Sequence, residues 1–136
     1  MTRKIALLVV IPWVLSACTV ESHPRPRGTV VSGDGSVTID WTIDGAKDPD
    51  SCAQSSAASI DIIVHTDAGD FAGEFQQACE AFATQIVLPS GGYVASAVLL
   101  DGGGADRTTA VDVDPFRVIA GTDLTVPIDF PARSFQ

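Results

Sequence analysis

Residues 37–44 read VTIDWTID, so that Val37, Ile39, Trp41 and Ile43 alternate with polar side chains. Successive side chains of a β-strand point to opposite faces, and this period of two therefore predicts a half-buried strand with one face in water. Turn-forming residues bound the segment, with Gly-Asp-Gly at 33–35 and Asp-Gly at 44–45. The segment indicates a β-sheet that covers a hydrophobic core with one of its faces.

The same alternation returns along the chain between clusters of glycine, proline, serine and aspartate. Residues 93–100 are mostly apolar at both the odd and the even positions, so both faces of the strand would be buried, which predicts a central strand. Pro127 cannot donate a backbone hydrogen bond, which predicts an edge position for the last strand or, as the alternative, a position 127 that faces away from a partner strand. The further strands are expected at residues 60–64, 71–75, 82–88, 93–100, 111–113 and 124–130.

Strands this short and this regularly spaced predict one all-β domain over residues 35–136, a single antiparallel β-sandwich of seven to eight strands. The hydrophobic content of 46% is too high for intrinsic disorder across the chain. Ser51 to Ser59 is rich in alanine and serine. We expect a loop there, with a short turn of helix as the alternative.

The segment Leu88-Pro89-Ser90-Gly91-Gly92-Tyr93 comes directly before a predicted strand. It is similar to the Leu-Pro-x-Gly-x-Tyr motif of transthyretin-like and carboxypeptidase-regulatory-like sandwiches. In Ig-like sandwiches a tyrosine at a comparable corner hydrogen-bonds back to the backbone. The resemblance covers six residues and implies a fold of this kind, but no particular activity, because β-sandwiches host many functions.

Residues 1–17 have the three parts of a secretory signal peptide. Arg3 and Lys4 are positive, residues 5–15 are apolar, and Ser16 and Ala17 are small. An apolar run of about 11 residues is too short to span a bilayer, which takes about 20. We therefore expect an export signal that is cleaved from the mature chain.

Leu15-Ser16-Ala17-Cys18 resembles the lipobox of bacterial lipoproteins. The resemblance implies cleavage directly before Cys18 and a diacylglyceryl group on its thiol, with fatty acids such as palmitate. More than one acyl chain makes membrane anchoring stable. The alternative is an incidental cysteine beside an ordinary signal-peptidase site. Thr19 favours the outer membrane if the source is Gram-negative, and residues 18–34 are expected to be the lipidated N-terminus and a short flexible tether.

Two cysteines remain once Cys18 carries lipid, and an exported chain with two such residues is expected to join them as one disulfide, Cys52–Cys79. A catalytic thiol is the weaker alternative, since acidic residues adjoin both positions and would disfavour a thiolate. A zinc site is also weaker, because two cysteines and two histidines at irregular spacing do not form a finger.

The chain holds 17 acidic residues against eight basic ones, and removal of Arg3 and Lys4 with the signal peptide leaves 17 against six, a formal charge of −11. Such a surface repels phosphate backbones, which argues against nucleic acid as a partner. It also argues against binding to anionic lipid head groups, which needs basic clusters. Any membrane attachment must then come from the N-terminus.

No constellation of catalytic or cofactor-binding residues emerges from the sequence. His23 lies in the tether, and His65 is expected on the solvent face of a strand, without a nucleophile motif nearby. Weak calcium candidates are Asp44, Asp48 and Asp50 in one loop, and Asp101 with Asp106 in another, although their spacing differs from the EF-hand pattern. The Gly102–Gly104 run leads into a strand, so a hairpin turn is favoured over a phosphate loop.

These observations predict a non-catalytic, lipid-anchored extracytoplasmic domain without cofactor, whose role is binding or structural in the cell envelope. Its expected partners are the membrane, through Cys18, and an envelope protein, peptidoglycan or another polysaccharide. An exposed aromatic or apolar patch should then mark the contact face, and Trp41 is the residue to inspect for it, although its inward parity favours the core. The alternatives are an accessory module of an envelope enzyme system and a calcium-dependent adhesive domain.

Overall fold

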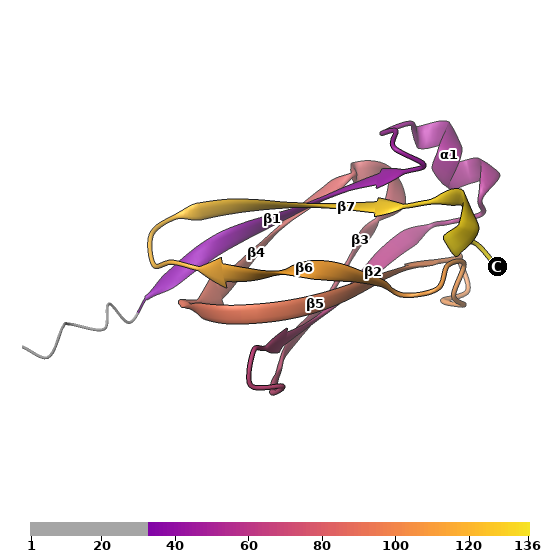
Figure 1. Cartoon of the computed structure of the whole chain (residues 1–136). Helices are drawn as coiled ribbons and strands as arrows, with labels where there is room; N and C mark the ends of the chain where they lie inside the picture. Colours follow the sequence, from indigo (N-terminus) through magenta and orange to yellow (C-terminus); the bar gives the residue numbers. More distant parts are fainter. Residues whose placement is uncertain (1–32) are drawn as a thin grey trace, which may run out of the picture.

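The computed structural model describes residues 33–136, so the predicted signal peptide, Cys18 and most of the tether lie outside the described residues. The described chain forms seven strands, one α-helix and two short 3-10 helices (Figure 1). In chain order these are β1 (Asp34–Ile43), α1 (Pro49–Gln54), β2 (Ser59–Thr66), β3 (Phe71–Ala78), η1 (Cys79–Ala81), β4 (Ala83–Pro89), β5 (Gly91–Leu100), β6 (Val111–Val118), β7 (Asp123–Phe130) and η2 (Ala132–Ser134).

The strands form two sheets, one in the order β4-β1-β7 and one in the order β3-β2-β5-β6. The expected all-β sandwich of seven strands is confirmed. One pairing differs from the expected antiparallel arrangement, because β1 and β7 run parallel, with Val37 opposite Leu124 and Ile43 opposite Phe130. Both strands start at the same end of the sandwich (Figure 1). The alternation of a strand is the same in either direction, so it carries no information about this parallel pairing.

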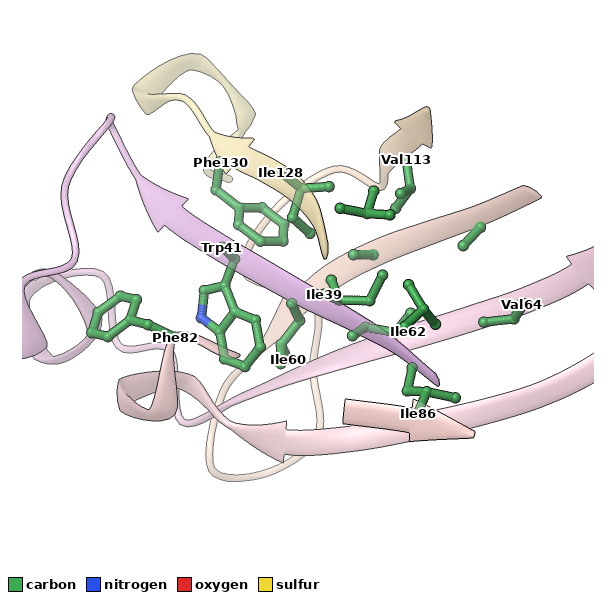
Figure 2. Packing of buried hydrophobic residues seen from close by; sticks show 14 of the residues in the cluster. Ile39, Trp41, Ile60, Ile62, Val64, Phe82, Ile86, Val113, Ile128 and Phe130 are labelled. Carbon is green, nitrogen blue, oxygen red and sulfur yellow. The ribbon is translucent and has the colours of Figure 1, made fainter. Parts of the chain in front are cut away.

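The inward-facing side chains of β1 lie at the centre of the core. Val37, Ile39 and Trp41 are all completely buried. Figure 2 shows Ile39 and Trp41 of β1 among Ile60 and Ile62 of β2, with Phe130 of β7 nearby. Full burial of such a side chain stabilises the fold by about 1.5–3 kcal/mol relative to exposure. Trp41 is therefore a core residue and does not belong to an exposed contact patch.

Both strand positions inferred from local sequence are confirmed. β5 lies between β2 and β6, as expected for a segment that is apolar at both parities. The inward-facing side chains of β5 are buried, whereas the outward-facing ones include Val94, which is 39% exposed. β7 is an edge strand, in agreement with the missing amide of Pro127.

The segment expected to be a loop starts within a six-residue helix, α1, so the alternative of a short turn of helix is the one observed there. Asp48 caps it, with Oδ1 accepting a hydrogen bond of 3.0 Å from the Asp50 amide, and Pro49 occupies the first turn. These are the residue types that favour the start of a helix. The alanine- and serine-rich composition concealed these start signals, which lie just before Ser51.

Candidate functional site

The predicted lipidation site cannot be placed, because Cys18 lies outside residues 33–136. β1 begins at Asp34, 16 positions after Cys18. The same end of the sandwich carries the turns that follow β2, β4 and β6, whereas α1, η1 and η2 lie at the opposite end (Figure 1). Within the described part of the chain, no helix is long and apolar enough to cross a membrane.

The predicted disulfide is present and joins α1 to η1. The Cys52 and Cys79 sulfurs are 2.03 Å apart, the Cα atoms are 6.1 Å apart, and both residues are buried. The Trp41 indole Nε1 donates a hydrogen bond of 2.9 Å to the Cys79 carbonyl, and the Trp41 ring packs at 6.4 Å from that of Phe82. The cross-link thereby attaches the helix end of the molecule to the central strand of the three-stranded sheet.

The loop aspartates interact with their own backbone. Asp48 caps α1, which includes Asp50 in its first turn, and Asp44 adopts a left-handed turn conformation with φ of 50°. The Asp101 carboxylate accepts hydrogen bonds from the amides of Gly103 (2.8 Å) and Ala105 (2.9 Å). No group of three or more His, Cys, Asp or Glu side chains in residues 33–136 is arranged to hold a metal ion.

The amides that bond Asp101 also affect its titration. Hydrogen bonds first from Ala105 and then from Gly103 favour the charged carboxylate and hold the pKa of Asp101 below its usual range. The glycine run at 102–104 is a turn closed by this aspartate, and Gly104 takes the positive φ of 83° that the turn requires.

Tyr93 makes a corner contact at the start of β5. Its hydroxyl donates a hydrogen bond of 2.7 Å to the carbonyl of Pro89, four residues earlier. The ring stacks on that of Phe116, with centroids 5.9 Å apart. The bond pins the turn between β4 and β5, and so connects the two sheets at the end where β1 begins.

The outer face of the β3-β2-β5-β6 sheet is the surface with the most distinctive chemistry. The backbone register aligns Glu74, Ile63, Ser96 and Asp112 in one row across all four strands. The neighbouring row aligns Phe71, His65 and Val94. We call this surface the acidic face; its outward side chains include Asp61, Ile63, His65, Phe71, Glu74, Gln76, Val94, Ser96, Val98, Asp112, Asp114 and Arg117.

An open hollow of about 470 Å³ lies in the acidic face, over β5 and β6. The register between these strands shifts between Tyr93 and Ala95, and such bulges redirect the neighbouring side chains. Phe71 is 65% exposed beside the hollow, and its ring meets that of His65 edge-on at 5.9 Å. The lining residues are His65, Val94, Ala95, Ser96, Asp112, Val113, Asp114 and Pro115.

Asp61 lies on the same face in an unfavourable setting. Its Oδ1 atom is buried and accepts no hydrogen bond. Burial disfavours the charged carboxylate, and the nearby charges of Glu74 and Asp106 add to this effect, so the pKa of Asp61 is raised above its usual value. The face carries the carboxylates of Asp61, Glu74, Asp112 and Asp114 against the single guanidinium of Arg117, so negative charge dominates it.

Sequence reasoning did not identify this surface. It placed His65, Asp112 and Asp114 on the solvent side of their strands, but it did not bring them together. The signal that could have found it is the identity of the side chains at the outward positions of each strand. Its apolar members, Ile63, Val94 and Val98, are unusual for a solvent face.

Comparison with known proteins adds little. No protein family matches the chain, and no curated protein matches it in sequence. The fold is similar to part of a leucine-rich repeat protein from Bacteroides thetaiotaomicron, with a TM-score of 0.45 and 18% identity over 74% of this chain. The matched part is 14% of that protein's length.

Proposed function

We propose that this chain is an exported lipoprotein, anchored in a membrane through lipid on Cys18, whose β-sandwich is a non-catalytic binding domain of the cell envelope. The observation that carries the proposal is the Cys52–Cys79 disulfide. Disulfides persist in oxidising compartments and are rare in the cytosol. An oxidised pair in the folded domain agrees with the oxidising compartment to which an export signal and a lipobox-like Cys18 would direct the chain.

The point at which the chain enters the sandwich is compatible with the same proposal. A chain anchored at Cys18 enters at Asp34, so the tether would join the anchor to the end of the sandwich where β1 begins. A flexible tether lets the domain stand off the bilayer without fixing its orientation, and both outer sheet faces would be open to partners. In a Gram-negative source, Thr19 favours the outer membrane.

The use of the polar residues supports a binding role over catalysis. The carboxylates of Asp48 and Asp101 accept hydrogen bonds from turn or helix amides. His65 packs against an exposed phenylalanine. What the described surface offers is a broad face with apolar and charged side chains, as protein contact sites have. An envelope protein or polysaccharide is the expected partner class.

A second candidate is an accessory module of an envelope enzyme system. It rests on the resemblance of residues 88–93 to the carboxypeptidase-regulatory-like motif. The hydrogen bond from the Tyr93 hydroxyl to the Pro89 carbonyl agrees with the fold that this motif implies. Co-purification with an enzyme encoded nearby would support this candidate over the first.

The anchor is tested by replacing Cys18 with serine and following the chain through detergent phase separation. The unsubstituted chain is expected in the detergent phase, and the Cys18→Ser chain in the aqueous phase or retained as an uncleaved precursor. Thr19→Ser is the matched control, because it alters the neighbouring side chain and keeps the thiol. Intact mass should show a chain that begins at Cys18 with added lipid. Unchanged partitioning of a Cys18→Ser chain whose intact mass shows that the signal peptide has been removed would refute the anchor.

A further inference from the structure

The acidic face has a simple pattern of charge and apolarity. In the row Glu74–Ile63–Ser96–Asp112, a carboxylate stands on each outer strand and an apolar side chain and a hydroxyl stand between them. Val94 continues the apolar centre toward the end where β1 begins, next to the hollow. Glu74 on β3 and Asp112 on β6 are thus acidic margins that flank a strip over β2 and β5 in which Ile63, Val94 and Val98 are apolar. The same strip holds the polar side chains Asp61, His65 and Ser96.

The charge on this face is strongly one-sided. Its outward positions carry the four carboxylates of Asp61, Glu74, Asp112 and Asp114, and the base among the outward side chains of these strands is Arg117, opposite Gly92 at one end. The Asp61 Oδ1 atom lies within this field but is closed to solvent, and the Asp61 carboxylate receives a backbone hydrogen bond from Ile62. A cationic partner would supply compensating charge to the exposed carboxylates.

The spacing of the two acidic margins selects a particular kind of cation. Glu74 and Asp112 are three strand steps apart, which corresponds to about 14 Å at the usual spacing of about 4.8 Å between strands. In an extended peptide, residues four positions apart face the same side at about 13 Å. Two basic residues at positions i and i+4 would therefore reach both margins, and an apolar residue at i+2 would lie over the strip.

We propose that the acidic face binds an extended segment of a partner protein that carries lysine or arginine at positions i and i+4 and an apolar residue at i+2. This names the partner class of the binding domain proposed above, and so rests on that function. A second copy of this chain fits poorly as the occupant, because stacking two such faces would bring like charges together. Anionic lipid is disfavoured for the same reason.

The test is a titration of the full chain, purified in a neutral detergent, with fluorescently labelled peptides followed by anisotropy. The peptide GKSVSKG has the proposed spacing, GKKSVSG has the same composition with adjacent lysines, and GESVSEG reverses the charge. We expect the first to bind most tightly, the third not to bind, and binding of the first to weaken as salt rises from about 50 to about 500 mM.

Two double variants locate the binding site. Glu74→Gln with Asp112→Asn should raise the dissociation constant of GKSVSKG by about fivefold, the loss of two exposed ion pairs of ordinary strength. Asp44→Asn with Asp123→Asn removes the same charge from other parts of the surface and should leave binding unchanged. Removing like charges from the face relieves repulsion, so we expect both variants to fold, which circular dichroism checks.

Equal weakening by the two double variants would overturn the proposal, since binding would then follow net charge alone. So would equal affinity for the two lysine peptides, absence of binding to GKSVSKG, or a chain dimer that the peptide cannot displace. These failures are distinct from failure of the proposed function. If the Cys18→Ser chain leaves the detergent phase while the peptides fail to bind, the lipoprotein assignment stands and the partner class is wrong.

Discussion

Replacing Cys52 and Cys79 together with alanine should lower the free energy of unfolding by about 3.5 kcal/mol. The disulfide closes a loop with a sequence separation of 27 residues. For a loop of this length, the chain-entropy relation gives a loss of about 12 cal/mol/K in the unfolded state, or about 3.5 kcal/mol at 25 °C. Alanine is chosen because both positions are buried, and serine would add an unpaired hydroxyl at each.

The loss is large for a domain of this size. With an unfolding entropy of about 2.1 cal/mol/K per residue over residues 33–136, a change of 3.5 kcal/mol lowers Tm by about 16 °C. This loss is a sizeable share of the whole free energy of unfolding, which for native proteins is typically about 5–15 kcal/mol. The hydrogen bond from Trp41 to the Cys79 carbonyl uses the backbone and should survive in the variant.

Urea unfolding followed by far-UV circular dichroism measures this difference. The variant should also show a larger m-value, because an unfolded chain without the cross-link exposes more surface. Wild-type protein reduced with dithiothreitol should behave like the variant, and Gln54→Ala, an exposed change in the same helix, should change stability by less than about 0.5 kcal/mol. A double variant within about 1 kcal/mol of wild type, with an unchanged m-value, would refute the loop-closure reasoning.

Three further substitutions test individual contacts by the same urea assay. Trp41→Phe leaves the buried Cys79 carbonyl without its indole donor and should lower stability by about 2 kcal/mol; a loss under about 0.5 kcal/mol would show that the bond contributes little. Tyr93→Phe removes the hydroxyl bonded to Pro89 and should lower stability by about 1 kcal/mol, with no loss expected if water replaces the bond. Asp61→Asn should raise stability at pH 7. The pKa of Asp61 is raised by folding, so its favourable contribution is full below the unfolded value of 3.8 and is lost as pH rises through the folded value. The advantage of the variant should therefore shrink toward pH 3.5, and an advantage that is independent of pH would contradict this origin.

The candidate site shows where sequence reasoning stopped. Alternation placed His65 on the solvent side of its strand, but it gave no outward side for residues 93–100 and wrongly placed Phe71 on the inward side with Phe75. Phe71 is 65% exposed, because the register between β2 and β3 shifts between Val64 and His65. The assembly of the outward residues into one surface depends on the sheet order β3-β2-β5-β6 and on register between segments that are far apart in sequence. The hollow depends further on a bulge between β5 and β6. Neither the sheet order nor the bulge can be predicted from the sequence of a single strand.

The sequence by itself determined the local properties of this protein. Alternation specified which side of β1, β2, β4, β6 and β7 is buried, the missing amide of Pro127 indicated an edge, and the cysteine count indicated the cross-link between Cys52 and Cys79. Tertiary structure alone decided the parallel pairing of β1 with β7 and the row from Glu74 to Asp112. The physical reason is that alternation depends on neighbouring residues, whereas strand partners, direction and register are chosen by how the whole chain buries its apolar surface.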